Sequence, residues 1–410
     1  MKFMKTISLI FILFFVICWT PRPPFSNGKW RAVIHRNDGN DIVFNFEVQS
    51  KGEKKILYVL NAGERLLVDQ VKVDEDSVLI QMPFFESRFQ GKLDADGHLE
   101  GVWIKRLADH DQVMPFEAFP HQDQRFRVNE APRLNVSGRW PARFRDRQGE
   151  ITEAIGEFVQ SGSRVTGTFL TGTGDYRFLE GVVSGDSLKL SGFDGGHAFL
   201  FTSRISNDST MDGSFYSGIA APESWTAHKD NKAELPDGYD QTHMRKGESK
   251  LDFRFRSIDG NYISLSDPRF KNKVVIIQVM GSWCPNCMDE TQFLSDYYTK
   301  HHQQGLEIIA LAYERSTDFE RSKASLERFR NRFQVQYPIL VTGVTVSDPQ
   351  RAERTLPQLD NLAAFPTSIF IDRSGKVRKI YTGFSGPGTG QHFEAFKKEF
   401  DQTIKELLAD

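Results

Sequence analysis

Two cysteines lie three positions apart in the segment VVIIQVMGSWCPNCMDETQFL, residues 274–294, and the whole chain has only three. The apolar run before them predicts a buried strand, and the residues after Cys284 predict a helix with Pro285 at its first position, where a missing N–H does no harm. The unpaired N–H groups and the dipole of a helix N-terminus favour a thiolate. The spacing therefore predicts thiol–disulfide exchange, in which an exposed Cys284 attacks and Cys287, one turn further on, resolves.

Other uses of such a cysteine pair do not fit its surroundings. A structural zinc site needs four ligands, and the sequence has no second Cys-x-x-Cys and no histidine pair at ligand spacing. A c-type haem requires histidine directly after the second cysteine, where Met288 stands. A structural bridge across two residues would close almost no loop and stabilise little. The histidines of the N-terminal part are scattered, so we expect them on the surface and expect no metal site: His35, His98, His110, His121, His197 and His228.

Length and composition describe a folded chain of two to four domains. Of the 410 residues, 39% are hydrophobic and 26% are charged, which is enough to bury several cores. The net charge of −2 provides no basic surface, so nucleic acid is not an expected partner.

The first residues predict export. Two lysines precede the apolar run TISLIFILFFVI, which ends at Cys18 and is too short for an ordinary transmembrane helix. Residues 1–18 are interpreted as a signal peptide or a lipoprotein signal, with Cys18 as the possible lipidation site. Ile17 stands where bacterial lipoproteins usually have a small residue, and an uncleaved short anchor is the alternative. A membrane tether through the N-terminus is possible in either case.

The long region before the cysteine pair repeats itself. GKWRAVI from Gly28 returns as GRWPARF from Gly138, so Trp30 and Trp140 are 140 − 30 = 110 positions apart. DSVLI and DSLKL, from Asp76 and Asp186, are separated by the same interval. These matches predict a tandem duplication with modules at residues 28–120 and 138–228.

Each module reads as a chain of short strands without helices. Evenly spaced strands separated by Gly, Asp, Asn and Lys favour an antiparallel meander closed into a barrel. The opening Gly-x-Trp resembles the lipocalin-like barrels, while two half-barrels forming one sandwich is the alternative. We expect Trp30 and Trp140 to be core residues rather than the lining of a ligand cavity, and the modules to bind or position a partner.

The chain changes character after a polar linker at residues 229–250. Residues 251–410 alternate strands with helices, which we expect at about residues 287–302, 318–332, 350–359 and 391–408. This order predicts an α/β sheet covered on both faces. The fold class is therefore multidomain: two tandem all-β antiparallel barrel-like modules followed by an α/β domain.

The segment GSWCPNC followed by Asp-Glu, together with Phe-Pro-Thr at residues 365–367, resembles the TlpA/ResA-like branch of the thioredoxin superfamily. The resemblance covers about residues 251–408 and implies a thioredoxin fold and disulfide reductase activity in the periplasm or cell envelope. It implies no cofactor beyond the redox-active Cys284–Cys287 disulfide. The partners it implies are disulfide-containing proteins such as apocytochrome c and a membrane dithiol donor.

The resemblance also assigns residue roles. Glu290 corresponds to the family's active-site carboxylate, whose raised pKa would suit proton exchange with Cys287; the alternative is an ordinary first-turn helix acid. The neighbouring Asp289 is expected to face solvent. Pro366 takes the place of the family's cis-proline, and the backbone of Phe365 is expected to pair with substrate. The implied substrate contacts are Trp283, Pro285, Phe365, Pro366 and Thr367.

Two departures from the family pattern leave the direction of electron flow open. Thr291 and Gln292 follow Glu290 where the family usually has a proline, and Pro285-Asn286 replaces the Gly-Pro of cytosolic thioredoxins. Two other functions remain as alternatives. A peroxiredoxin-like thiol peroxidase shares the fold, although its Pro-x-x-x-Thr-x-x-Cys motif is absent. A lipocalin-like ligand-binding protein with an accessory redox domain is the other.

Overall fold

The computed structural model describes residues 24–206, 209–235 and 238–409. The predictions for residues 1–18, including Cys18, lie outside this range. In the described part of the chain, no helix combines the length and the hydropathy that a membrane crossing requires.

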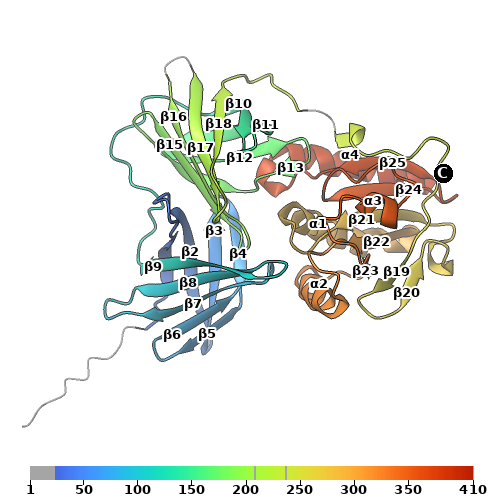
Figure 1. Ribbon diagram of the computed structural model, residues 1–410, viewed down its shortest axis with the longest axis horizontal. Helices are drawn as coiled ribbons and strands as arrows, with labels where there is room; N and C mark the ends of the chain where they lie inside the picture. Colours follow the sequence, from blue (N-terminus) through green and yellow to red (C-terminus); the bar gives the residue numbers. More distant parts are fainter. Residues whose placement is uncertain (1–23, 207–208, 236–237, 410) are drawn as a thin grey trace, which may run out of the picture.

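The first β module is a nine-stranded antiparallel sheet with strand order β4-β3-β2-β1-β9-β8-β7-β6-β5 (Figure 1). Its strands are β1 (Gly28–Ile34), β2 (Ile42–Lys51), β3 (Lys54–Asn61), β4 (Glu64–Val68), β5 (Gln70–Asp74), β6 (Ser77–Gln81), β7 (Ser87–Leu93), β8 (Leu99–Arg106) and β9 (Asp111–Pro120). The antiparallel meander and its barrel-like form are as predicted; the end strands of the sheet, β4 and β5, are separated in the chain by Asp69 alone.

The second β module is also antiparallel, with strand order β11-β10-β18-β17-β16-β15-β14-β12-β13. Its strands are β10 (Gly138–Arg145), β11 (Ile151–Ser161), β12 (Arg164–Thr171), β13 (Gly174–Asp175), β14 (Leu179–Ser184), β15 (Ser187–Phe193), β16 (Ala198–Ile205), β17 (Thr210–Ser217) and β18 (Glu223–His228). An additional pairing between β11 and β12 closes this sheet into a barrel, which removes its exposed edges.

The tryptophans at the start of the two modules occupy equivalent positions. Trp30 on β1 and Trp140 on β10 are both buried, as expected for core residues. Each indole Nε1 donates to the carbonyl oxygen four residues earlier, Trp30 to Ser26 at 3.0 Å and Trp140 to Val136 at 2.8 Å. This shared detail supports the interpretation that the modules are copies of one ancestor.

The two modules are docked into one another. Phe193, at the end of β15, enters the first module and stacks on Phe44 with ring centroids 4.2 Å apart. The side-chain amide of Asn61 pairs with the backbone of Phe193, donating to its carbonyl at 2.7 Å and accepting from its N–H at 3.2 Å. Buried Arg125 adds a hydrogen bond to the Ser191 carbonyl at 3.0 Å. The modules therefore form one continuous support.

The C-terminal domain is a seven-stranded mixed sheet with strand order β20-β19-β23-β22-β21-β24-β25. Its strands are β19 (Arg254–Ser257), β20 (Tyr262–Ser264), β21 (Val274–Met280), β22 (Leu306–Ala312), β23 (Ile339–Val341), β24 (Thr367–Ile371) and β25 (Val377–Thr382). Its helices are α1 (Pro285–His301), α2 (Phe319–Phe333), α3 (Arg351–Thr355) and α4 (Gln391–Ala409). Strands β21, β22 and β23 are parallel to one another. Strand β24 is antiparallel to β21, and β25 is antiparallel to β24.

Both faces of this sheet are covered, as predicted. Alternate residues of a strand point to opposite faces, so Ile276 and Ile277 on β21 belong to different cores. Leu294 of α1, with α2 and α4, joins the core that contains Ile276. Leu356, which follows α3, joins the core that contains Ile277. The helices also lie close to their expected positions.

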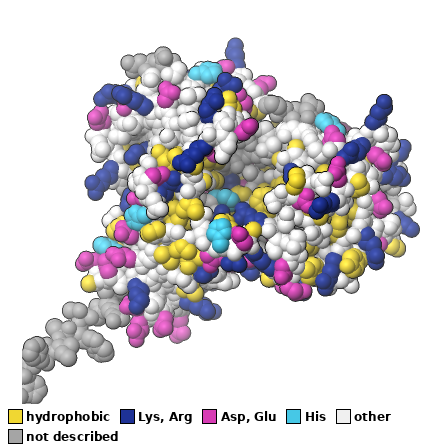
Figure 2. Space-filling model, in the orientation of Figure 1, with side chains coloured by type: hydrophobic (Ala, Val, Ile, Leu, Met, Phe, Trp, Pro, Cys, Tyr) yellow, Lys and Arg dark blue, Asp and Glu magenta, His cyan; other side chains and the backbone are white. Residues whose placement is uncertain are grey.

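The C-terminal domain packs directly against the β modules, in addition to being joined to them by the linker. Phe84 of the first module stacks on Phe333 of α2 with ring centroids 5.7 Å apart. Arg321 of α2 forms an ion pair with Glu86 at 3.0 Å. In the space-filling view the two parts meet along a hollowed seam in which hydrophobic side chains gather (Figure 2).

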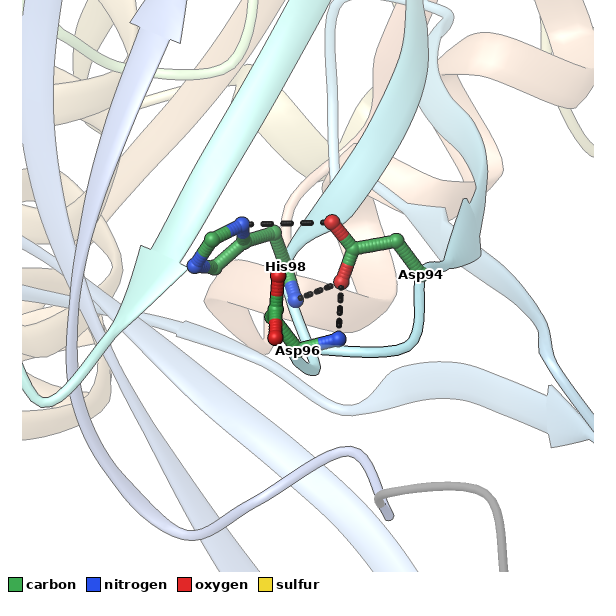
Figure 3. A group of neighbouring side chains, drawn as sticks. All are labelled: Asp94, Asp96 and His98. Atoms are coloured by element: carbon green, nitrogen blue, oxygen red, sulfur yellow. Dashed lines mark hydrogen bonds and ion pairs between the residues drawn. The ribbon is translucent and has the colours of Figure 1, made fainter. Parts of the chain in front are cut away.

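A turn between β7 and β8 gathers three polar side chains, Asp94, Asp96 and His98, with their ligand atoms within 4.8 Å of one another (Figure 3). One oxygen of Asp94 accepts the backbone N–H groups of Asp96 and His98 at 2.9 and 2.8 Å. Its other oxygen lies 3.2 Å from the His98 ring. The Asp94 carboxylate thus stabilises the turn itself, which accounts for the cluster.

Candidate active site

Cys284 and Cys287 lie at the junction of β21 and α1, where the sequence predicts them. They are joined in a disulfide with their Cα atoms 5.2 Å apart. Cys284 is the N-cap residue of α1, and its Sγ accepts the backbone N–H of Cys287 at 3.1 Å. Pro285 occupies the first helical position. The N–H group of Cys287 has no carbonyl partner within the helix and points at Cys284 Sγ, where it would stabilise the thiolate of the reduced protein.

The expectation that Cys284 is exposed is wrong. Its exposed fraction is 3%, and that of Cys287 is 0%. The second β module approaches the first turn of α1 and limits access from outside. Asn286 donates to the Asp175 carboxylate at 3.2 Å, and a Cβ atom added at Gly174 would lie 2.8 Å from the Asn286 side chain.

The loop before Cys284 is fixed by buried hydrogen bonds from β22 and the residues after it. Glu314 accepts from the backbone N–H of Ser282 at 2.8 Å and from its hydroxyl at 2.7 Å. Burial raises the pKa of Glu314. The indole of Trp283 donates to the Tyr313 carbonyl at 2.8 Å. Sequence reasoning did not identify Glu314, because its partner lies 32 positions away.

The loop before β24 lies beside the cysteines. The peptide bond between Phe365 and Pro366 is cis, as the resemblance implies. The carbonyl oxygen of Phe365 is 3.6 Å from Cys284 Sγ. The Phe365 ring packs edge-on against the Trp283 ring, with centroids 5.6 Å apart. Thr367, which is fully buried, donates to the Ala364 carbonyl at 2.8 Å and thereby fixes the loop rather than facing a substrate.

Glu290 is fully buried, one turn beyond Cys287 on α1. Its carboxylate accepts from Gln278 of β21 at 2.8 Å and from Ser368 of β24 at 2.9 Å. Burial raises the pKa of Glu290 to about 7, although both hydrogen bonds favour the charged form. The acid therefore changes protonation state near neutral pH, which suits proton transfer in either direction.

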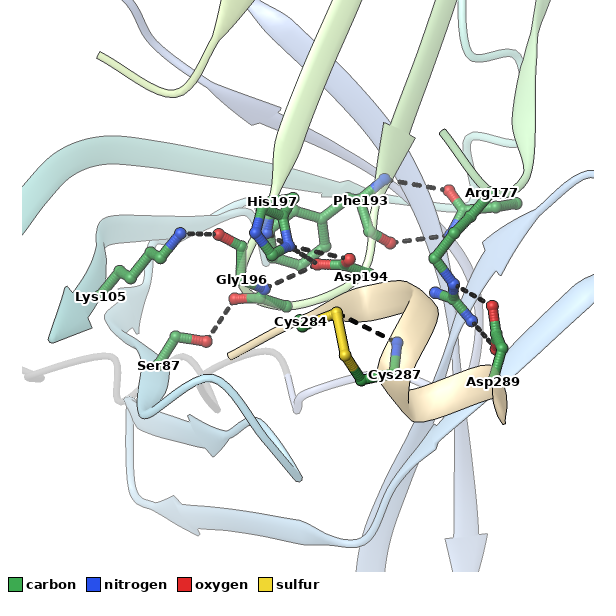
Figure 4. Close-up of polar contacts among 12 residues, drawn as sticks. Ser87, Lys105, Arg177, Phe193, Asp194, Gly196, His197, Cys284, Cys287 and Asp289 are labelled. Carbon is green, nitrogen blue, oxygen red and sulfur yellow. Dashed lines mark hydrogen bonds and ion pairs between the residues drawn. A yellow bond between two sulfur atoms is a disulfide. The ribbon is translucent and has the colours of Figure 1, made fainter. Parts of the chain in front are cut away.

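Asp289 does not face solvent, contrary to expectation. Its carboxylate receives two hydrogen bonds from Arg177 of the second module, both at 2.8 Å. Arg177 also reaches Glu64 of the first module at 2.7 Å. The three side chains are buried, and each comes from a different part of the fold. Figure 4 shows Arg177 and Asp289 facing one another beside the disulfide.

A His–Asp pair stands in the turn between β15 and β16, with Asp194 buried and the His197 side chain 19% exposed, so His197 is not the fully exposed surface residue that we expected. Its Nδ1 lies 3.0 Å from the Asp194 carboxylate. Burial lowers the pKa of His197, whereas the pair holds the pKa of Asp194 at about 2 despite its burial. Ser87 and Lys105 of the first module donate to the carbonyl oxygens of this turn and hold it in place (Figure 4).

A pocket of about 360 Å³ lies where the second module meets the start of α1, and we call it the junction pocket. Pro285, Asn286 and Phe365 form its wall on the C-terminal domain. The wall contributed by the modules combines acidic, aromatic and imidazole side chains: Glu64, Asp175, Tyr176, Asp194, His197 and Phe199. Of the predicted substrate contacts, the structure thus brings Pro285 and Phe365 to a cavity.

Comparisons with known proteins find relatives of the C-terminal part of the chain. Residues 245–396 match the Redoxin family. The thiol-disulfide oxidoreductase ResA of Geobacillus thermodenitrificans is 28% identical over 159 residues, which are 38% of this chain and 82% of the relative. ResA of Halalkalibacterium halodurans is 26% identical over 145 residues, 35% of this chain and 72% of the relative.

A solved structure with a related description is the thiol:disulfide interchange protein, a thioredoxin family protein, of Chlorobium tepidum. It is 20% identical, has a TM-score of 0.30, and covers 39% of this chain and 95% of its own. The expected thioredoxin-like α/β domain behind two β modules is confirmed by the fold and the family match together.

Proposed function

We propose that this chain, whose C-terminal part is a thiol–disulfide oxidoreductase of the thioredoxin type, is an exported disulfide reductase of the cell envelope. Its substrates would be disulfide-containing proteins such as apocytochrome c, and its electrons would come from a membrane dithiol donor. The N-terminal apolar segment supports export, and the two β modules would position the redox domain and select its substrates.

One observation carries the proposal: Cys284 caps α1, and the N–H of Cys287 points at its sulfur at 3.1 Å. A thiolate at this position is stabilised by the helix terminus and is therefore both a competent nucleophile and a good leaving group. Cys287, fully buried one turn further on, is shielded from the substrate and is placed to resolve the mixed disulfide.

The reaction transfers two electrons through one mixed disulfide. The Cys284 thiolate of the reduced protein bonds to one sulfur of the substrate disulfide, the substrate S–S bond breaks, and the released sulfur takes up a proton. Cys287 then gives its proton to Glu290 and attacks Cys284 Sγ, so the bond between Cys284 and the substrate breaks and the second substrate sulfur leaves as a thiolate that takes up a proton from solvent. The protein is left with the Cys284–Cys287 disulfide, which the dithiol donor reduces again.

Residues around the cysteines would align the substrate. Among the described residues, the backbone N–H of Phe365 makes no hydrogen bond, and the carbonyl oxygen of the same residue lies 3.6 Å from Cys284 Sγ. An extended substrate segment could therefore pair with the backbone of Phe365, in the manner of a strand added to a sheet edge.

The proposal is tested by single-turnover reduction of a protein disulfide, such as that of insulin, by the prereduced protein. We expect two free substrate thiols for each Cys284–Cys287 disulfide formed, and no reaction from Cys284→Ser. Absence of substrate reduction by the wild type, or consumption of hydrogen peroxide in its place, would reject the reductase in favour of a thiol peroxidase.

A further inference from the structure

The junction pocket lies next to the attacking cysteine and is bounded by three parts of the chain. The C-terminal domain contributes Pro285 and Asn286, which directly follow Cys284, and Phe365, whose carbonyl oxygen is 3.6 Å from Cys284 Sγ. The modules contribute the remainder of the wall, so a substrate that reaches Cys284 through this pocket must also contact them. A volume of about 360 Å³ holds one or two side chains and not a folded protein surface.

The wall is held in place before any substrate arrives. Lys105 donates to the Gly196 carbonyl and Ser87 to the Gly195 carbonyl, which fixes the turn that carries Asp194 and His197. Asp175 accepts the backbone N–H of Gly386 at 2.8 Å, which fixes the opposite side. A rigid wall of this kind selects a side chain by its shape and charge, because little ordering is required on binding.

The charge of the lining is negative. Glu64, Asp175 and Asp194 face the pocket, and among the described residues that line it the one guanidinium is that of Arg177, which is already paired with Asp289 and Glu64. Outside the lining, the positive charges of Lys105 and Arg315 act on His197. Burial raises the pKa of Asp175 to about 6 and that of Glu64 above its usual range, although Arg177 opposes both shifts. A further cation in the pocket would favour the charged form of both carboxyl groups.

The same wall is aromatic. Tyr176, Phe199 and Phe365 line the pocket together with the carboxylates. Aromatic faces and carboxylates together attract an ammonium or guanidinium group at the end of an aliphatic stem, because the rings contact the stem and the cation while the carboxylates neutralise the charge.

We propose that the junction pocket receives a lysine or arginine side chain that lies within about two residues of the substrate cysteine attacked by Cys284. This inference rests on the proposed reductase function and names its substrate class: an extended, unfolded segment with a basic residue beside its cysteine. The β modules are then part of the substrate site and not only a support for the redox domain.

The test uses three disulfide peptides of one sequence that differ only in having Lys, Leu or Glu beside the cysteine. The rate at which prereduced protein reduces each peptide is followed by Trp fluorescence and thiol release. We expect the Lys peptide to react about tenfold faster than the Glu peptide, with Leu between them and a smaller difference in high salt. Equal rates for the three peptides would overturn the proposal.

A pair of neighbouring variants tests whether the pocket is responsible. Thr152 lines the pocket, and its cross-strand partner Phe144 is buried, whereas adjacent Ile151 points to the opposite, exposed face. Thr152→Trp should remove the preference for the Lys peptide, and Ile151→Trp should keep it. An unchanged preference in Thr152→Trp would contradict the assignment, and if that variant fails to fold, the wild-type ranking of the peptides decides alone.

The experiment also separates this inference from the proposed function. A wild-type protein that reduces neither the peptides nor insulin rejects the reductase itself. A wild-type protein that reduces all of them without regard to charge retains the reductase and rejects the basic-residue pocket.

Discussion

Arg177 of the second β module and Asp289 of the active-site helix form a buried ion pair with two hydrogen bonds of 2.8 Å. Asp289 comes two residues after Cys287, so the pair ties the module directly to the first turns of α1. Arg177 has a backbone φ of 55°, a left-handed conformation that favours glycine, and its side chain is held there by Asp289 and Glu64.

Replacing Arg177 with Met should destabilise the protein by about 3 kcal/mol, because two buried carboxylates lose the cation that compensates them. Urea unfolding followed by circular dichroism measures the change. The matched control is Arg143→Met, which removes an exposed pair with Glu153 and should cost about 0.5 kcal/mol or less. Equal effects of the two substitutions would show that the Arg177 pair contributes no more than a surface pair.

The burial of Cys284 predicts slow alkylation of the reduced protein. Iodoacetamide should modify Cys284 before Cys287, because Cys284 caps the helix and is the less enclosed of the two. Modification of Cys284 should still be much slower than that of a free thiol. Arg177→Met should accelerate modification of Cys284 by loosening the contact with the module. Mass spectrometry of timed samples identifies the site, and faster labelling of Cys287 would reverse the assigned roles.

Glu290→Gln should lower the apparent pKa of the cysteine pair, because a neighbouring negative charge is removed. The same substitution should slow disulfide reduction near neutral pH on the order of a hundredfold, because the proton acceptor for Cys287 is lost. The fluorescence of Trp283 reports the titration. Asp296→Asn, which neutralises an exposed acid on the same helix, is the control. Unchanged pKa and rate would leave Glu290 as a purely structural acid.

Glu290 also predicts a pH dependence of stability. Its pKa is raised to about 7 in the folded protein, from an ordinary value of 4.5. The folded state therefore holds the proton more tightly than the unfolded state, so stability is greatest below pH 4.5 and is lost as the pH rises to about 7. Glu290→Gln should remove this loss, and above pH 7 it should be more stable than wild type, by at most about 3 kcal/mol. Thermal unfolding between pH 4 and 8 would test this, and parallel profiles would contradict it.

The local features of the redox site were predictable from the sequence because their signals are short in range. The apolar strand, Cys284, Pro285 and Cys287 lie within one segment, and helix-capping rules apply to them directly. The repeat at Trp30 and Trp140 was likewise visible, because two copies in one chain can be compared with each other.

Features that depend on the docking of the modules were not predictable. Arg177 and Asp289 are 112 positions apart in different parts of the fold, so no periodicity relates them. His197 was interpreted as a surface residue because its pattern shows no ligand spacing, yet module docking largely buries it against Asp194. The burial of Cys284 likewise depends on segments far apart in the sequence: the Phe365 carbonyl lies 3.6 Å from its sulfur, and the second module contacts the neighbouring Asn286.

Trapping the mixed disulfide tests the central claim most directly. Cys287→Ala removes the resolving sulfur, so the reduced variant should form a stable, one-to-one covalent adduct with a disulfide substrate, joined through Cys284. Non-reducing electrophoresis and peptide mass spectrometry would detect the adduct and locate the bond, and addition of dithiothreitol should release it. Failure of Cys287→Ala to form an adduct with a substrate that the wild type reduces, or an adduct on another residue, would contradict the account.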